Sequence, residues 1–212
     1  IKYTPNDYIY YADALINTGK YDEAIASYKH IPEVDPENKD VNKYIAEAYA
    51  KAKRFGDAVT AYEQYLKDKG DAVTYKEYDS FADIYIEQAD AATSDAEKKE
   101  AFKKAADIYG LIAEKFDYAA IYAVSKQATA YYQINPDLKV GASLPYYTKL
   151  IELIAAKDEK TASDNNKLIT AYNYLAVHYI QNDKVAEAKK YAEKLLELSP
   201  ENETGKQIMN LK

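Results

Sequence analysis

Cysteine and tryptophan are absent from the 212-residue sequence, and glycine and proline are scarce, with six of each. The absence of cysteine excludes disulfides, thiolate metal sites and a cysteine nucleophile. The two histidines, His30 and His178, lie too far apart in sequence to form a paired-histidine metal motif. Because all-β folds need many tight turns, the scarcity of glycine and proline favours helices joined by short connections.

Arginine is also scarce, since Arg54 is the single arginine in a chain with 28 basic residues, 35 acidic residues and a net charge of −7. Nucleic-acid binding requires clustered Lys and Arg, so this balance argues against a nucleic-acid partner. No apolar run reaches the roughly 18 residues that a membrane span needs, and we expect no transmembrane segment. Because the sequence begins at Ile1 without a methionine, we expect a mature form or an excised fragment.

What the chain does contain is a repeated pattern in the segments 19–38, 53–70 and 183–202. Each segment has a large apolar residue followed three positions later by alanine: Tyr21 and Ala24, Phe55 and Ala58, Val185 and Ala188. Another alanine lies 12 residues upstream of the first in each case, at Ala12, Ala46 and Ala176. We call these six residues the marker alanines. The spacing from Ala12 to Ala46 is 34 residues, which is a period typical of stacked helix hairpins.

This pattern resembles the tetratricopeptide repeat (TPR), a 34-residue helix hairpin in which small residues let helices approach and aromatic residues fill the gaps. The resemblance implies an all-α fold, a right-handed superhelical solenoid of TPR hairpins with a C-terminal capping helix. It also implies a single TPR domain over residues 1–212. The expected repeats are approximately 5–38, 39–72, 73–117, 118–156 and 166–200, and the capping helix is 201–212.

Two of the expected repeats depart from the regular pattern. In the third, the capping box Ser94–Glu97 predicts a helix start at Ser94 and a longer hairpin. In the fourth, Gln127 stands where a large apolar residue is expected, and Pro145 predicts that the second helix begins near Leu144. The polar stretch Lys157–Asn166 is expected to be a loop that lengthens the step to the fifth repeat.

Three further expectations concern helix ends and packing. Pro32 falls late in the second helix of the first repeat and predicts a kink or an early end there. In the capping helix, Ile208 and Leu211 are expected to face the core. Tyrosine supplies 24 residues, and those at pattern positions are expected to pack between helices: Tyr8, Tyr21, Tyr28, Tyr49, Tyr62, Tyr78, Tyr85, Tyr131, Tyr172 and Tyr179.

The resemblance also suggests a binding surface, because the first helices of successive TPR hairpins line an inner, concave face. On that face the second and third repeats carry many charged residues, whereas the fourth and fifth are uncharged and amphipathic. Tyrosine is a common anchor at interfaces, and an apolar patch with amides suits a bound peptide. The expected partner-binding residues are Tyr122, Ser125, Thr129, Tyr132, Asn173, Val177 and Gln181. Tyr122 and Tyr132 have a second interpretation, in which they pack only against the neighbouring repeat.

The function expected from this pattern is a protein–protein interaction scaffold that binds a peptide or a partner protein in the concave groove. The alternative is a self-associating structural unit with no peptide ligand. Asp13 stands where chaperone-binding TPR domains place a carboxylate-gripping residue, so a clamp for a chaperone tail is not expected. Without a nucleophile–base set or a phosphate-binding glycine loop, we expect no enzyme, no cofactor and no metal.

Localisation and assembly are expected from the resemblance alone. A TPR array of this size is similar to bacterial envelope lipoproteins that scaffold outer-membrane assembly, which suggests the bacterial periplasm or cell envelope. We expect a monomer rather than an oligomer, with a protein or peptide as the partner.

Overall fold

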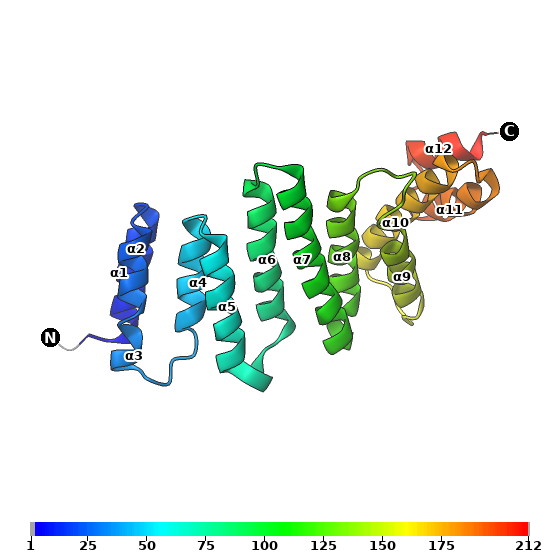
Figure 1. Cartoon of the computed structure of the whole chain (residues 1–212). Coiled ribbons are helices and arrows are strands. Elements are labelled where there is room, and N and C mark those ends of the chain that lie inside the picture. Colours follow the sequence, from blue (N-terminus) through cyan, green and yellow to red (C-terminus); the bar gives the residue numbers. More distant parts are fainter. Residues whose placement is uncertain (1–2, 212) are drawn as a thin grey trace. The chain divides into compact units, whose positions relative to one another are not determined.

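A computed structural model describes residues 3–211, and its regular elements in that range are helices without any strand (Figure 1). The predicted all-α fold is therefore confirmed. The chain forms two compact units, Ile1–Ala101 and Phe102–Lys212. The single domain over 1–212 stays a prediction, and its residues 1, 2 and 212 lie outside the described residues.

The first unit is built from short antiparallel helix pairs. Helix α1 packs against α2, α2 against α4, α4 against α5, and α5 against α6. The elements are α1 (Pro5–Asn17), α2 (Tyr21–Tyr28), α3 (Ile31–Val34), α4 (Val41–Lys51), α5 (Phe55–Lys69), the 3-10 turn η1 (Gly70–Ala72) and α6 (Tyr75–Ala91). The boundary between the units falls within α7 (Asp95–Lys115).

The second unit has the same scheme of helices packed in sequence. Helix α8 packs against α9, α9 against α10, and α10 against α11, while α12 contacts both α10 and α11. The elements are the 3-10 turn η2 (Asp117–Ala119), α8 (Ala120–Ile134), α9 (Leu144–Ala155), α10 (Ala162–Gln181), α11 (Val185–Leu198) and α12 (Glu203–Met209).

Small residues stand wherever two helices of a hairpin approach closely. All six marker alanines are fully buried, with no exposed surface, as is Ala128 at the corresponding position of the fourth hairpin. The fourth hairpin has Ser143 in place of the second alanine, also fully buried. Its hydroxyl donates a hydrogen bond of 2.8 Å to the carbonyl oxygen of Ala128, so the buried polar group is satisfied.

Three of the hairpin turns share one backbone conformation. The residue two positions before the second helix is left-handed in each, with φ of 76° at Gly19, 59° at Lys53 and 59° at Asp183. The next residue donates its amide back to the carbonyl five residues earlier, at 2.9 Å in all three turns. This is the Schellman helix end, and it lets the second helix begin almost at once.

Most of the predicted helix ends are confirmed. Helix α7 begins at Asp95, directly after Ser94, whose hydroxyl and amide both contact the Glu97 carboxylate. Helix α9 begins at Leu144, and α2 ends at Tyr28, before Pro32. Helices α6 and α7 are both long, as expected, with 17 and 21 residues.

Two sequence-based expectations are wrong. The stretch Lys157–Asn166 is not a loop throughout, because α10 already begins at Ala162, where Thr161 and Asp164 form a capping box. Leu211 does not face the core but is 42% exposed, since α12 ends at Met209 and no longer directs its side chain inward. Ile208, within that helix, is buried as predicted.

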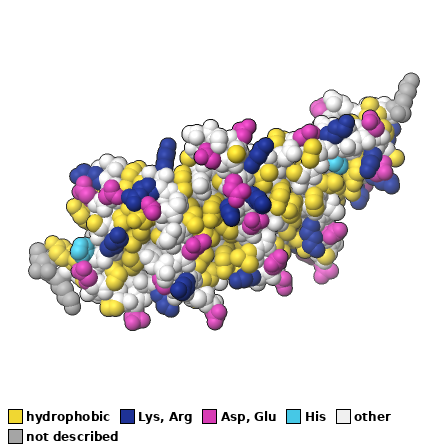
Figure 2. Space-filling view, in the orientation of Figure 1, with side chains coloured by type: hydrophobic (Ala, Val, Ile, Leu, Met, Phe, Trp, Pro, Cys, Tyr) yellow, Lys and Arg dark blue, Asp and Glu magenta, His cyan; other side chains and the backbone are white. Residues whose placement is uncertain are grey.

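The surface has no extended region of one charge on the face drawn in Figure 2, where basic and acidic side chains alternate with apolar ones. Within residues 3–211, no helix is both long enough and apolar enough to cross a membrane.

Candidate partner-binding clefts

The second unit contains a cleft of about 280 Å³ between α8 and α10, with α9 beneath it, which we call the α8–α10 cleft. Two of the residues predicted from sequence, Ser125 and Thr129, form its α8 wall. The lining residues are Ser125, Thr129, Tyr147, Leu150, Ser163, Asn166, Lys167 and Thr170. The cleft thus combines hydroxyl and amide groups on its walls with an apolar floor, which is the chemistry expected for a small ligand or peptide site.

The floor is held rigidly by aromatic contacts. The ring of Tyr147, buried in α9, lies 4.7 Å from the ring of Tyr174 in α10. The hydroxyl oxygen of Tyr174 accepts a hydrogen bond of 3.2 Å from the amide of Ser143. Burial raises the pKa of Tyr147 and of Tyr174, so both phenols stay neutral at ordinary pH.

Hydrogen bonds within each helix fix the polar groups of the walls. Thr129 donates to the carbonyl of Ser125 at 3.1 Å, and Thr170 donates to the carbonyl of Asn166 at the same distance. Lys167 donates to the hydroxyl of Ser163 at 2.6 Å. Lys167 is the only charged residue among those lining the cleft.

The α10 wall exists because α10 is longer at its N-terminal end than the first helices of the other hairpins. It begins 14 residues before its marker alanine, Ala176, whereas α8 begins 8 residues before Ala128. Three of the lining residues, Ser163, Asn166 and Lys167, belong to this extension. The Thr161–Asp164 capping box starts the extension, and the ammonium of Lys157 bonds the Asp164 carboxylate.

The pKa of Asp164, at the start of α10, is strongly lowered. Hydrogen bonds from Lys157 and from Thr161 lower the pKa of Asp164 to about 2. The carboxylate is only 6% exposed and accepts from both the amide and the hydroxyl of Thr161, at 2.9 and 2.8 Å. Asp164 is therefore ionised at any physiological pH and holds the extension in helical form.

The turn that joins α8 to α9 is tied to the other end of α10. The ring nitrogen Nδ1 of His178 lies 2.6 Å from the carbonyl oxygen of Leu138, and the amide of Asn182 donates to the carbonyl of Lys139 at 3.0 Å. Gly141, with φ of 73°, lies directly on the imidazole, and a Cβ atom there would come within 2.6 Å of Cε1. Both ends of α10 are therefore fastened relative to the α8–α9 hairpin.

Gln127, the departure from the repeat pattern, has a structural explanation. Its amide nitrogen donates to the carbonyl of Ala106 in α7 at 3.2 Å. A Cβ atom on Gly110 would lie 2.9 Å from that same nitrogen, so glycine makes room for the polar side chain. The polar residue is accommodated in the packing between helices and does not line the cleft.

The other predicted binding residues lie outside the cleft lining. Tyr122 is half-buried, with the ammonium of Lys126 5.6 Å from its ring centroid. Tyr132 is exposed and meets Tyr174 edge to face at 6.4 Å. Farther along α10, two residues are half-buried and one is exposed: Asn173, Val177 and Gln181. A binding role stays a prediction for all seven residues of the predicted set, which also includes Ser125 and Thr129.

Sequence reasoning missed four residues of the α10 wall: Ser163, Asn166, Lys167 and Thr170. The signal that would have found them was present. Thr161 followed three residues later by Asp164 marks a helix start, as the Ser94–Glu97 box does for α7.

The first unit has a cleft in the corresponding place, between α4 and α6, with a volume of about 250 Å³. Its floor includes Tyr62, which occupies the same repeat position as Tyr147. Its lining residues are Glu47, Ala50, Lys51, Tyr62, Ser80, Asp83, Ile84 and Glu87. Charged residues thus make up half of the lining, in agreement with the charge expected for the second and third repeats.

Ion pairing partly offsets the acidity of this first-unit cleft. Lys51 lies 3.9 Å from Glu87 across the cleft. Desolvation is the largest influence on Glu47 and, with the charge of Asp13 adding to it, raises the pKa of that carboxyl. Asp13 itself accepts a hydrogen bond of 2.8 Å from the hydroxyl of Tyr28, so it is fixed as an acceptor.

Serial helix hairpins with small residues at each crossing, and clefts between successive first helices, define a helical-repeat protein. Two models of the tetratricopeptide repeat match the chain, over residues 15–77 and 169–202. These two segments are thus tetratricopeptide repeats, and the resemblance found in the sequence is confirmed. No curated protein matches it.

Solved structures agree on the fold. The C-terminal part of a TPR repeat-containing protein from Cytophaga hutchinsonii is 23% identical, with a TM-score of 0.67 over 99% of this chain and 75% of that one. YrrB, a TPR protein with an unusual peptide-binding site, is 15% identical, with a TM-score of 0.51 over 96% and 91%. MamA from Desulfovibrio magneticus RS-1 (residues 41 to the end) is 14% identical, with a TM-score of 0.51 over 94% and 97%.

The family sets the general role of the molecule. TPR proteins bind protein or peptide partners, and the fold is that of a protein–protein interaction scaffold. The family and its fold are typically non-enzymatic.

Proposed function

We propose that the chain is an interaction scaffold that holds an extended segment of a partner protein in the α8–α10 cleft. The observation that carries this proposal is the cleft itself, which places hydroxyl and amide groups over a buried Tyr147 and Leu150 floor. Its volume of about 280 Å³ suits a few residues of peptide rather than a whole helix. The peptide-binding site of YrrB, which shares the fold, supports a peptide as the ligand.

The walls are suited to a peptide main chain. Because the threonine hydroxyls already donate within their helices, their oxygens remain as acceptors for peptide N–H groups. The Asn166 amide offers both a donor and an acceptor, so it matches the N–H and C=O groups of an extended segment.

A displayed peptide library, selected on the full chain, tests the proposal. Thr129→Trp fills the cleft and should remove most of the selected sequences. Thr148→Trp is the matched control, because Thr148 is an exposed threonine on α9 that also donates to the carbonyl four residues earlier, at 2.9 Å. If the two variants retain the same peptides, binding lies elsewhere and the proposal fails.

Self-association is the second candidate, and a feature of α1 favours it. Tyr10 and Tyr11 are 71% and 59% exposed. At the repeat position of Tyr11, later hairpins carry Ile45, Phe81 and Leu175, all buried. Sedimentation velocity over a hundred-fold concentration range should reveal a dimer that Tyr10→Ser with Tyr11→Ser abolishes. A concentration-independent monomer refutes this candidate.

Placement in the bacterial periplasm or cell envelope, with a role in envelope assembly, is part of the proposal and is supported by the resemblance to envelope scaffolds. Immunoblotting of periplasmic, membrane and cytoplasmic fractions of the producing cells tests it. Recovery of the chain in the cytoplasmic fraction alone contradicts it.

A further inference from the structure

The α8–α10 cleft has a local charge that the rest of its lining does not balance. Lys167 is its one charged residue, and no carboxylate lines the cleft. The Lys167 ammonium donates to the hydroxyl of Ser163 at 2.6 Å and, at 3.4 Å, to the Ser163 carbonyl. Among the described residues no carboxylate lies within ion-pair distance of it. An ammonium has three donors, so Lys167 keeps donor capacity for a ligand.

The nearest acidic residue along the helix is already engaged. Asp164 accepts from Lys157 and from both polar groups of Thr161. Its position in the capping box holds it at the start of α10, and it does not line the cleft. The positive charge of Lys167 is therefore left for a group brought by the ligand.

The spacing along α10 fixes where a ligand charge would sit. From Ser163 to Thr170 the α10 wall extends by about 10 Å, at 1.5 Å of rise per residue. An extended chain advances by about 3.3 Å per residue, so the wall spans roughly three ligand residues. Lys167 lies between the ends of this wall, opposite the central one of these three ligand residues.

The lining continues on both sides of Lys167, with Ser163 toward the helix start and Thr170 one turn beyond. A chain end bound at Lys167 would leave one of these groups uncovered, whereas a chain that passes through contacts both. The geometry therefore points to a side-chain carboxylate within the ligand rather than to its terminal carboxylate.

We propose that the α8–α10 cleft selects an extended segment with a central Asp or Glu, whose carboxylate is bound by Lys167. This inference rests on the proposed function and adds the chemical class of the ligand. A half-exposed ion pair discriminates modestly, and we expect about a five-fold preference for an acid over its amide at low salt. The preference should weaken as ionic strength rises, because salt screens the pair.

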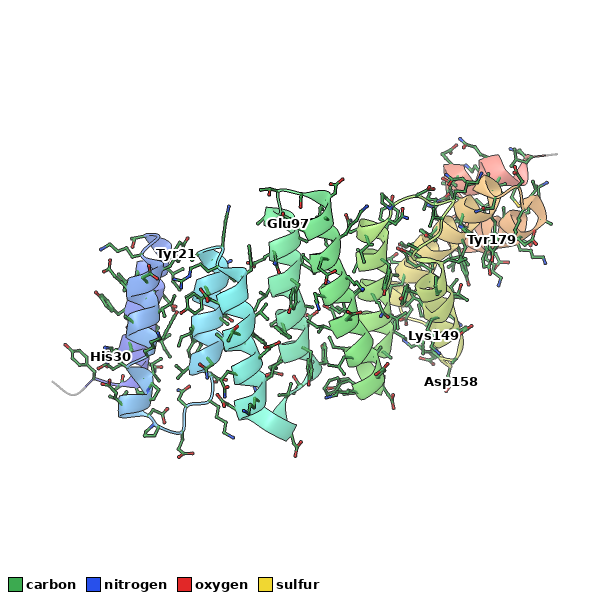
Figure 3. All side chains as sticks on the ribbon, in the orientation of Figure 1. Tyr21, His30, Glu97, Lys149, Asp158 and Tyr179 are labelled. Carbon is green, nitrogen blue, oxygen red and sulfur yellow. The ribbon has the colours of Figure 1, made fainter. Side chains whose placement is uncertain are left out.

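The probe is a pair of displayed peptide libraries mixed in equal amounts, one with Asp or Glu fixed at the centre and the other with Asn or Gln. Each peptide is fused through its C-terminus to the display protein, so no free terminal carboxylate is present. The library is selected on the wild type, on Lys167→Met and on Lys167→Arg. Lys149→Met is the control, since Lys149, labelled in Figure 3, is an exposed lysine of α9 that does not line the cleft.

The expected result is about a five-fold excess of acidic over amide sequences on the wild type, on Lys167→Arg and on Lys149→Met, and an even ratio on Lys167→Met. Circular dichroism of each variant confirms that its helices are intact. An even ratio on the wild type overturns the inference. If the peptides selected on the wild type fail to bind the Thr129→Trp variant, the proposed function survives that result.

Two further outcomes also overturn the inference. If no selected peptide depends on Thr129, both the ligand class and the proposed function fail together. If a selected peptide synthesised to end at its central residue, with a free α-carboxylate, binds more tightly than the full sequence, then the cleft takes a chain end instead.

Discussion

Protonation of Asp164 should loosen the N-terminal half of α10. The folded state lowers the pKa of this carboxyl from 3.8 to about 2, chiefly through its bond to Lys157. A difference of this size corresponds to roughly 2 kcal/mol of folding free energy if the pair is fully shielded. Lys157 is 34% exposed, so solvent screening reduces the expected contribution to about 1–2 kcal/mol.

The direction of the pH dependence follows from the sign of the shift. Because the folded state lowers the pKa, the stabilisation is fully present above pH 3.8 and is lost as the pH falls toward 2. Asp164→Asn should therefore cost about 1–2 kcal/mol at pH 7, and its difference from the wild type should vanish near pH 2. Glu77, whose pKa is also lowered to about 2, remains in both proteins and cancels in the comparison.

Urea unfolding followed by circular dichroism between pH 2 and pH 7 measures this difference. Asp158→Asn is the control, because Asp158, labelled in Figure 3, is an exposed carboxylate of the same connection, outside the capping box. Hydrogen exchange at amides 165–170 should accelerate in Asp164→Asn and not in the control. A gap between wild type and Asp164→Asn that stays constant from pH 7 to pH 2 would refute the reasoning.

Three further substitutions test the packing of the hairpins. Lys53→Gly should raise the unfolding free energy by roughly 0.5–1 kcal/mol, because glycine tolerates the φ of 59°, and chemical denaturation measures this gain. Gly141→Ala should destabilise the chain by at least about 1 kcal/mol through its contact with the His178 ring, and His178→Ala should relieve part of that loss in a double-mutant cycle. Ala58→Leu should overpack the second hairpin and cost roughly 1–3 kcal/mol, seen as a lower thermal midpoint; an unchanged midpoint would show that the site tolerates the added volume.

The repeat was predictable because close helix contacts demand small residues at a fixed spacing. Ala12 and Ala46 mark the same contact in successive hairpins, and both are fully buried. Tyr62 fills the gap beside such a contact and is buried as expected. These features follow from one local rule that repeats along the chain, so they can be read without knowledge of the whole fold.

The cleft was only partly predictable. Ser125 and Thr129 follow from the repeat register, but three of the four α10 wall residues lie upstream of that register, in the helical extension. The start of this extension depends on a side-chain hydrogen bond between Thr161 and Asp164. The polar composition of Lys157–Asn166 favoured a loop instead. Gln127 also departs from the pattern for a reason outside its own hairpin, since its partners, Ala106 and Gly110, belong to α7.

The extension of α10 has a consequence for protein engineering. Repeat arrays are commonly treated as interchangeable modules, in which one hairpin can be replaced by a consensus unit. Here the α10 side of the cleft is formed by residues 163–170, with the capping pair Thr161 and Asp164 and the anchoring Lys157 just before them. A consensus replacement that begins its first helix at the usual point would keep the hairpin contacts and delete most of that side of the cleft. Conversely, residues 157–170 form a compact cassette that could be transplanted ahead of another repeat's first helix to give a plain array a new recognition surface.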